Sequence, residues 1–198
     1  PEGTLEGGIR QFRAGADDRA RAELEAFLAA KPPRDGDYYR ANFLLGYLYM
    51  AGEDWQLASL HFYRVRKTEH PLAIYALYYE AYVDYRRGKY RASIPECEEY
   101  RERFPGGPFF EDCELLIADS HREAGRVSTA LKAYDTFLER YPDDAGVMRK
   151  LVSVQRAGNA DASAERVLQD WLARDPHDAV ASVMLAQVQA ELGKTAEA

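Results

Sequence analysis

Small residues recur along the chain at steps of 38, 35, 37, 34 and 34 positions. The members of this column are Ala20, Ala58, Ser93, Ala130, Ala164 and Ala198. A glycine stands five or six residues before each of them, as Gly15, Gly52, Gly88, Gly125, Gly158 and Gly193. A period of this length is typical of arrays in which one helical hairpin stacks on the next. We therefore predict a repeat protein rather than a globule with a single central core.

Three further columns keep the same register. Apolar residues follow the small residue after four positions (Leu24, Phe62, Cys97, Tyr134, Leu168) and after seven (Phe27, Val65, Tyr100, Phe137, Trp171). Twelve positions before it stand Gly8, Gly46, Ala81, Ala118, Val152 and Ala186, and each repeat closes on a proline (Pro32, Pro71, Pro105, Pro142, Pro176). Small residues let two helices cross closely, positions four and seven share one helix face, and proline cannot continue a helix. The glycine is expected to take the positive φ of a tight turn.

These columns resemble the tetratricopeptide repeat family. Its first-helix pattern is matched by Leu45, Gly46 and Tyr49, and its second-helix pattern by Ala58 with Phe62 and by Ala130 with Tyr134 and Pro142. A weaker match is Ser93 with Cys97 and Pro105. The resemblance implies an all-α, right-handed superhelix of about five full hairpins and a truncated sixth. It also implies that the first helix of each hairpin lines the concave surface.

We expect one solenoid domain over residues 1–198, as a piece of a longer protein. The predicted repeats span 1–34, 38–72, 73–107, 108–143, 144–177 and, truncated, 178–198. The three long steps indicate extended turns between the first repeats. Pro95 is expected to bend or delay its helix, and Glu80 and Asp84 stand where the family usually has an apolar residue and a tyrosine.

Two segments also resemble particular groups of proteins that contain such repeats. Residues 101–144 resemble the repeats of Gram-negative envelope proteins, and residues 69–94, which include His70, Pro71, Leu72, Ala73 and Tyr75, resemble the superhelix of soluble lytic transglycosylases. The first resemblance implies a periplasmic or envelope location, with the cytoplasm as the alternative. The second implies an accessory domain for an enzyme acting on peptidoglycan, whose catalytic domain this chain does not contain, so no catalytic residue is carried over.

Charge and motif content exclude several function classes. The net charge of −7 argues against a nucleic-acid backbone as partner, and no apolar run approaches the ~18 residues of a membrane span. Nucleotide-binding, metalloprotease and hydrolase signatures are missing. Four scattered histidines, interpreted as surface or groove residues, give no metal-ligand spacing: His61, His70, His121 and His177. We predict a non-catalytic scaffold for a protein or peptide ligand, without cofactor or metal; a module that mainly self-associates is the other alternative.

Tyrosines concentrate where the resemblance places the binding surface. Tyr75, Tyr78, Tyr82 and Tyr85 follow i, i+3, i+7, i+10 spacing and form one stripe. The predicted concave face comprises Phe12, Arg13, Arg40, Phe43, Tyr47, Met50, Tyr75, Tyr78, Tyr82, Tyr85, Arg86, Asp119 and Arg122. Tyrosine suits binding because it offers large amphipathic contact area at low entropy cost. The alternative is that these tyrosines form the core between repeats.

Two further expectations concern Cys97, Cys113 and the last repeat. The cysteines stand on consecutive helices and could form a disulfide in an oxidising compartment, or else remain two buried thiols. In the last repeat, Val183, Leu185, Ala186 and Val188 are expected to lack a full cover, because the chain stops before a second helix can pack on them. We expect that end to be frayed or covered by other sequence.

Overall fold

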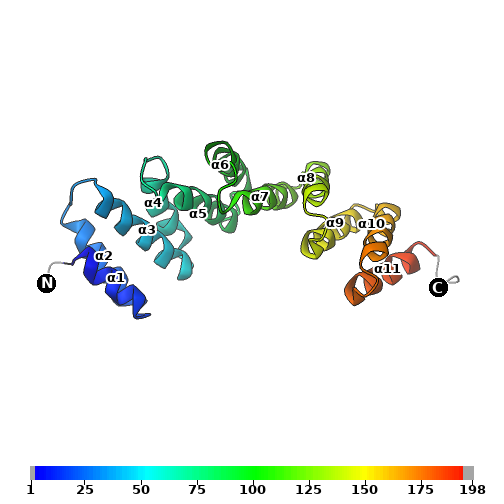
Figure 1. Ribbon diagram of the computed structural model, residues 1–198, viewed down its shortest axis with the longest axis horizontal. Helices are drawn as coiled ribbons and strands as arrows, with labels where there is room; N and C mark the ends of the chain where they lie inside the picture. The colour runs from blue at the N-terminus through cyan, green and yellow to red at the C-terminus, as the bar shows by residue number, and fades with distance from the viewer. Residues whose placement is uncertain (1–2, 194–198) are drawn as a thin grey trace. The chain divides into compact units, whose positions relative to one another are not determined.

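The computed structural model describes residues 3–193 as eleven α-helices with no β-strand among them (Figure 1). The helices are α1 (Leu5–Arg13), α2 (Asp17–Ala29), α3 (Gly36–Ala51), α4 (Trp55–Arg66), α5 (Ala73–Arg86), α6 (Tyr90–Arg103), α7 (Phe110–Glu123), α8 (Val127–Arg140), α9 (Ala145–Ala157), α10 (Asp161–Arg174) and α11 (Ala179–Glu191). The predicted all-α hairpin array is confirmed. No helix in the described range is long and apolar enough to cross a membrane.

The helices pair in chain order, the first and second helix of each hairpin being joined by a three-residue turn. They form two compact units, residues 1–116 and 117–198, and the division falls inside α7. In the first unit, α1 to α6 pack each against the next. In the second, α8 to α11 do the same. Helix α11 is the first helix of the sixth predicted repeat, and the small residue expected for its partner, Ala198, lies outside the described residues.

The predicted columns form the cores. Every described member of the small-residue column is fully buried, and so is every member of the column four residues later. Gly46 shows why the crossing tolerates little bulk, because a Cβ there would come within 2.7 Å of the Phe62 ring. Ala186 is an exception to its column, since it is exposed in the structure. The spacing therefore identified the helix faces that pack, as expected for a 3.6-residue period.

The turns inside the hairpins correct one expectation. Gly15, Gly88, Gly125 and Gly193 do have positive φ angles near 70°. Gly52 and Gly158 do not; each ends its helix with φ −84° or −91°, and the positive φ falls on the next residue, Glu53 (60°) or Asn159 (57°). In these two repeats the small residue comes six positions after the glycine instead of five, so the left-handed position moves by one.

The connections between hairpins follow the irregular steps of the repeat. They cover six residues at the first three junctions (30–35, 67–72 and 104–109) and four at the next two (141–144 and 175–178). The expected extended turns are therefore present. The expectation that Pro95 delays its helix is wrong, because α6 begins at Tyr90 and contains Pro95. The ring is exposed and costs the helix one backbone hydrogen bond without stopping it.

Helix α11 is better covered than the sequence indicated. Val188 and Ala181 are fully buried in a core that includes Leu168 and Trp171 of α10. Val183, by contrast, is 57% exposed. The expectation of an uncovered apolar face is therefore wrong for Val188 and fits Val183, because α11 turns one stripe toward α10 and leaves the other open.

Candidate binding face

Aromatic side chains of three successive first helices touch in an unbroken series. Phe12 of α1 lies 5.9 Å from Tyr47 of α3, ring centre to ring centre, and Tyr47 lies 6.3 Å from Tyr79 of α5. Phe43 of α3 meets Tyr75 and Tyr79 at 6.2 and 6.1 Å, and Tyr75 lies 5.8 Å from Phe109. We call this set the aromatic band: Phe12, Phe43, Tyr47, Tyr75, Tyr79 and Phe109.

The aromatic band is half open to solvent. Tyr47 and Tyr75 are each 38% exposed, whereas the other four rings are half-buried. Edge-to-face geometry dominates, with interplanar angles of 87° for Phe12 with Tyr47 and 82° for Tyr75 with Phe109. Such pairs hold each other in place. Burial also raises the pKa of Tyr79, so its hydroxyl stays protonated and can donate a hydrogen bond.

The predicted tyrosine stripe of α5 divides between different surroundings. Tyr78 stacks on Phe109 at 4.1 Å and 7° and also contacts Tyr100 of α6. Burial, with a smaller contribution from Asp112, raises the pKa of Tyr78 well above its ordinary range. Tyr78 therefore belongs to the packing between hairpins, as the alternative reading of the stripe proposed.

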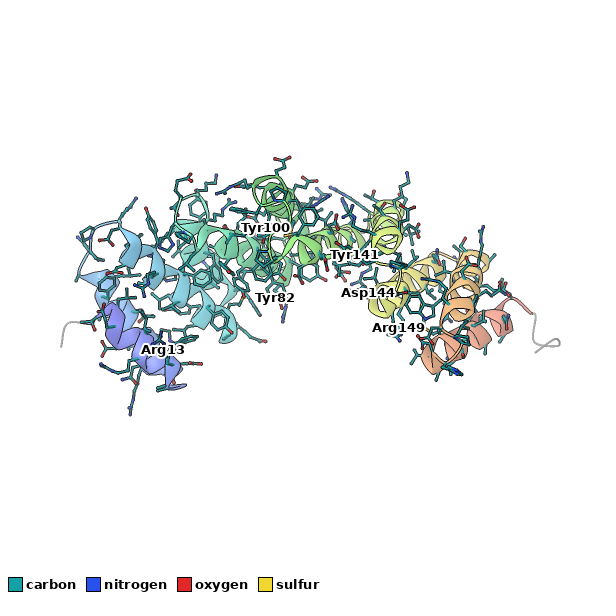
Figure 2. All side chains as sticks on the ribbon, viewed as in Figure 1. Arg13, Tyr82, Tyr100, Tyr141, Asp144 and Arg149 are labelled. Atoms are coloured by element: carbon teal, nitrogen blue, oxygen red, sulfur yellow. The ribbon has the colours of Figure 1, made fainter. Side chains whose placement is uncertain are left out.

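The two later tyrosines of the stripe leave the aromatic band. Arg86 donates a hydrogen bond of 2.9 Å to the Tyr82 hydroxyl and lies 4.6 Å from the ring centre of Trp55 in α4. Tyr85 packs edge-to-face on Tyr90 at 5.4 Å. Figure 2 labels Tyr82 on α5, with Arg13 on α1 of the same unit. Only Tyr75 of the four thus lies in the aromatic band.

Sequence reasoning missed Tyr79 and Phe109. A usable signal was present, because Tyr75, Tyr79, Tyr82 and Arg86 follow i, i+4, i+7, i+11 spacing. That series fits a 3.6-residue period as well as the one chosen. Phe109 had no such signal, since it stands in the connection before α7.

Three more predicted residues stand on helices α1 and α3, which also carry rings of the aromatic band. Arg13 is exposed at the end of α1, and Arg40 is exposed and pairs with Asp37 at 3.2 Å. Met50 is half-buried against the core of the first unit. The two arginines can therefore reach a ligand, whereas Met50 contributes mainly to packing.

Asp119 and Arg122 belong to the second unit and serve a different purpose. The Tyr134 hydroxyl donates to the Asp119 carboxylate, and Lys150 Nζ lies 2.6 Å from the same carboxylate. Arg122 pairs with Glu123 at 2.7 Å. Asp119 is almost covered and links α7, α8 and α9, so it is already satisfied within the fold.

Cys97 and Cys113 meet as the sequence proposed. Both are buried, and the two thiols hydrogen-bond to each other, which together with burial raises the pKa of Cys97. In this structure they are free thiols, so the alternative of two buried thiols describes it. The disulfide stays a prediction for oxidising conditions.

His61 is not the surface or groove residue that we expected. It is buried in α4, where its Nδ1 donates to the Asn42 side-chain oxygen at 3.0 Å and its ring stacks on Tyr49. Burial, then the nearby Arg64, lowers its pKa to about 4. The Tyr49 hydroxyl donates in turn to Glu25 of α2. This network joins three helices, and within residues 3–193 no cluster of histidine, cysteine and carboxylate side chains could hold a metal ion.

Glu80 and Asp84, the unusual acids of α5, are both buried. Arg66 of α4 bridges Glu80 at 2.6 Å and Glu99 of α6 at 3.1 Å. Burial raises the pKa of Glu80 to about 8, and the neighbouring Arg66 only partly offsets it. The pKa of Glu96 rises to about 7 for the same reason, burial, with Asp84 adding to it. The acids therefore belong to the packing between α4, α5 and α6 rather than to a binding surface.

The chain was compared with protein-family models, curated proteins and solved structures. Residues 115–179 match the family model of the tetratricopeptide repeat. The chain has the tetratricopeptide-repeat fold. A structure of MamA from Desulfovibrio magneticus is 16% identical with a TM-score of 0.69, covering 87% of this chain and 93% of that one. No curated protein matches the sequence.

Two further tetratricopeptide-repeat proteins are similar in structure. One, from Parabacteroides merdae, is 14% identical with a TM-score of 0.71, and the match covers 96% of this chain and 72% of that one. The other, YrrB, is described as having an unusual peptide-binding site. It is 15% identical with a TM-score of 0.67, and the match covers 88% and 86% of the two chains. At these identities the likeness concerns the fold.

Proposed function

We propose that this tetratricopeptide-repeat chain is a non-catalytic scaffold that holds a partner peptide along its aromatic band, in the bacterial periplasm or envelope. The observation that carries the proposal is the continuous contact of the six rings, with Tyr47 and Tyr75 each more than a third exposed. Rings already fixed by their neighbours lose little side-chain entropy when a ligand covers them.

A peptide suits the aromatic band better than a highly charged ligand. The surface of the aromatic band is apolar and carries the hydroxyl groups of Tyr47, Tyr75 and Tyr79. These hydroxyl groups can donate hydrogen bonds to peptide carbonyl oxygens. Arg13 and Arg40 are exposed on α1 and α3, the helices that carry Phe12, Phe43 and Tyr47, and can pair with a carboxylate of the ligand. YrrB, which has the same fold, is described as binding peptide, and this is consistent with the proposal.

The test starts by identifying what touches the aromatic band. A photo-crosslinking amino acid is placed at position 47, 75 or 127 and activated in the native host. Val127 is the matched control, because it is an apolar residue, 41% exposed, at the start of the second helix α8 and lies in neither proposed site. We expect one shared crosslinked protein from positions 47 and 75 that position 127 does not give.

The crosslinked segment, made as a labelled peptide, is then titrated with purified variants. Tyr47→Ala and Tyr75→Ala should each weaken binding by roughly 30-fold, the effect of about 2 kcal/mol at a hot spot. Val127→Ala should leave it unchanged. Equal affinity of all three variants would contradict the proposed face.

Three further experiments test the other expectations. In the first, the wild-type chain and the Tyr75→Ala variant are each sedimented with isolated peptidoglycan. Co-sedimentation that is lost in the variant would mean that the ligand of the aromatic band is a glycan strand and not a peptide. Cell fractionation of the tagged chain tests its location, and recovery with cytoplasmic markers alone would overturn the envelope assignment. A mass in solution that doubles with concentration would favour self-association as the main activity.

A further inference from the structure

A pocket lies between the start of α3, the α4 helix and the two adjoining connections, and none of its lining residues belongs to the aromatic band. Its volume is about 410 Å³, and its lining residues are Arg34, Tyr38, Tyr39, Leu60, Tyr63, Arg64, Lys67 and Thr68. We call it the α3–α4 pocket. Leu60 and Tyr63 of α4 are 44% and 54% exposed, so two of the most exposed apolar side chains of the described chain stand at one place.

The charge of the α3–α4 pocket is opposite to that of the whole chain. Three of its lining residues are cationic and none is acidic, although the chain carries a net charge of −7. Within residues 3–193, Arg34, Arg64 and Lys67 have no carboxylate partner among the ion pairs of the structure. Of the acids that adjoin the pocket in sequence, Asp35 caps α3 and Asp37 pairs with Arg40, whereas Glu69 follows Thr68 and is exposed.

Two of the three cations, Arg34 and Arg64, contact aromatic or polar groups of the fold. Arg64 donates to the buried Asn42 side-chain oxygen at 3.1 Å, and Asn42 donates to the Tyr38 carbonyl oxygen at 2.8 Å. The Arg34 guanidinium lies 6.0 Å from the centre of the Tyr38 ring. Tyr38 in turn packs edge-to-face on Tyr39 at 5.5 Å. The pocket therefore has a fixed aromatic wall and a cationic rim.

We propose that the α3–α4 pocket binds an acidic peptide segment in which a bulky apolar side chain stands next to carboxylates. The apolar side chain would enter between Leu60 and the tyrosines, and the carboxylates would pair with the rim cations. Arginine forms strong charge-assisted hydrogen bonds with carboxylates, and clusters of it recognise acidic motifs. The apolar wall favours a peptide over a small inorganic anion, which would leave Leu60 and Tyr63 uncovered. This site is separate from the aromatic band and does not rest on its function.

The test uses a fluorescein-labelled peptide of sequence Asp-Phe-Glu-Asp-Leu-Glu and fluorescence anisotropy with the full chain. Two matched peptides separate the two chemistries: Asn-Phe-Gln-Asn-Leu-Gln removes the charge, and Asp-Ala-Glu-Asp-Ala-Glu removes the apolar side chains. Each should bind at least about tenfold more weakly than the first, because each loses one of the two contributions. Equal binding of either one would overturn the proposal. Inorganic phosphate at equal ionic strength should compete no better than chloride, and full competition would reduce the pocket to a simple anion site.

Variants locate the binding. Arg34→Gln with Lys67→Gln should weaken the first peptide at least about tenfold, and both side chains are exposed, so folding is little affected. The control is Arg19→Gln with Arg166→Gln, which removes the same charge from exposed positions of α2 and α10. Loss of binding in the control pair would show an effect of net charge alone and overturn the site. Tyr47→Ala, in the aromatic band, should leave this peptide unaffected, so the two sites are distinguished.

Discussion

At the scale of single residues, position around α5 decides what a tyrosine contributes. Tyr75 is 38% exposed and meets its neighbours by edges, whereas Tyr78 lies flat on Phe109 at 4.1 Å. Tyr75 offers surface to a ligand, and Tyr78 fills space between hairpins. Replacing Tyr75 by alanine should therefore affect mainly binding, and replacing Tyr78 should affect mainly stability.

Tyr78→Ala is expected to lower the free energy of unfolding by about 3–5 kcal/mol, because it removes a largely buried ring and leaves a cavity. Tyr75→Ala should cost less than about 1 kcal/mol, since its ring already meets water. Urea unfolding followed by circular dichroism measures both. A Tyr78→Ala chain as stable as Tyr75→Ala would mean that the stack on Phe109 contributes nothing. Tyr78→Phe, which keeps the ring, is the control.

The buried acid Glu80 should make stability depend on pH. Its pKa is raised from 4.5 to about 8, so between these values the folded chain keeps a proton that the unfolded chain has released. Stability from this group is full at low pH and is lost as the pH rises toward 8. His61 acts oppositely: its pKa falls from 6.5 to about 4, so it destabilises the fold only below about pH 6.5.

Between pH 6.5 and 8, the pH dependence of stability therefore reports on the buried acids Glu80 and Glu96 and not on His61. We expect the wild-type free energy of unfolding to fall across it, by at most about 1.4 kcal/mol per pH unit for each proton involved. Glu80→Gln should flatten this fall, and adding Glu96→Gln should flatten it further, because the pKa of Glu96 is also raised, to about 7. Denaturant titrations at both pH values measure it. An equal fall in wild type and double variant would show that Glu80 is ionised when folded.

At the scale of the element, α6 shows what a helix tolerates when its neighbours hold it. Pro95 stands in the sixth position of α6, yet the helix continues to Arg103. Tertiary contacts offset the backbone hydrogen bond that the proline removes, because α6 is buried on both sides of Pro95, at Ile94, Cys97 and Tyr100. Burial of an apolar face outweighs the missing hydrogen bond.

Pro95→Ala should therefore stabilise the chain. The side chain is exposed, so no packing is lost, and the backbone hydrogen bond to Arg91 becomes possible. The expected gain is up to about 3 kcal/mol, the cost of proline relative to alanine inside a helix. Thermal unfolding by differential scanning calorimetry measures it. Arg91→Ala, an exposed change on the same helix, is the control, and an unchanged melting temperature for Pro95→Ala would mean that the helix is already relaxed around the ring.

At the scale of the whole molecule, stability is expected to vary along the array, since each hairpin touches only its neighbours. Helix α11 packs on α10 through Ala181 and Val188 but leaves Val180 and Val183 about half exposed or more. Its remaining links to α9 include the ion pair between Arg156 and Glu191 at 2.7 Å, in which the Glu191 side chain is 52% exposed.

Amide hydrogen exchange should show this gradient. We expect the amides of α11 to exchange faster than those of α10, whose Leu168 and Trp171 are buried, because local opening of α11 exposes less apolar surface. Mass spectrometry of peptic peptides from the dilute monomer gives the comparison. Equal protection of α10 and α11 would mean that the second unit opens as one. Arg156→Gln should speed exchange in α11 further.

The hairpin array, the helix faces and the buried columns could all be predicted from the sequence. This is possible because those features depend on local spacing: a small residue every 34 to 38 positions, with apolar residues four and seven places later, already fixes which side of each helix is apolar. Pro95 and the glycine turns show the limit of such reasoning. At Gly52 one additional residue moved the positive φ to Glu53.

Which tyrosines are exposed, and which cations of the α3–α4 pocket have no carboxylate partner, depends on tertiary packing. Tyr78 and Tyr79 are neighbours in sequence, and both spacings on α5 are helical; Phe109, from a distant connection, covers one ring and borders the other. Likewise, the α3–α4 pocket collects residues from two helices and two connections. Sequence periodicity does not predict which of two neighbouring helix positions is buried, or which distant segments come into contact. Both depend on the elements that pack alongside.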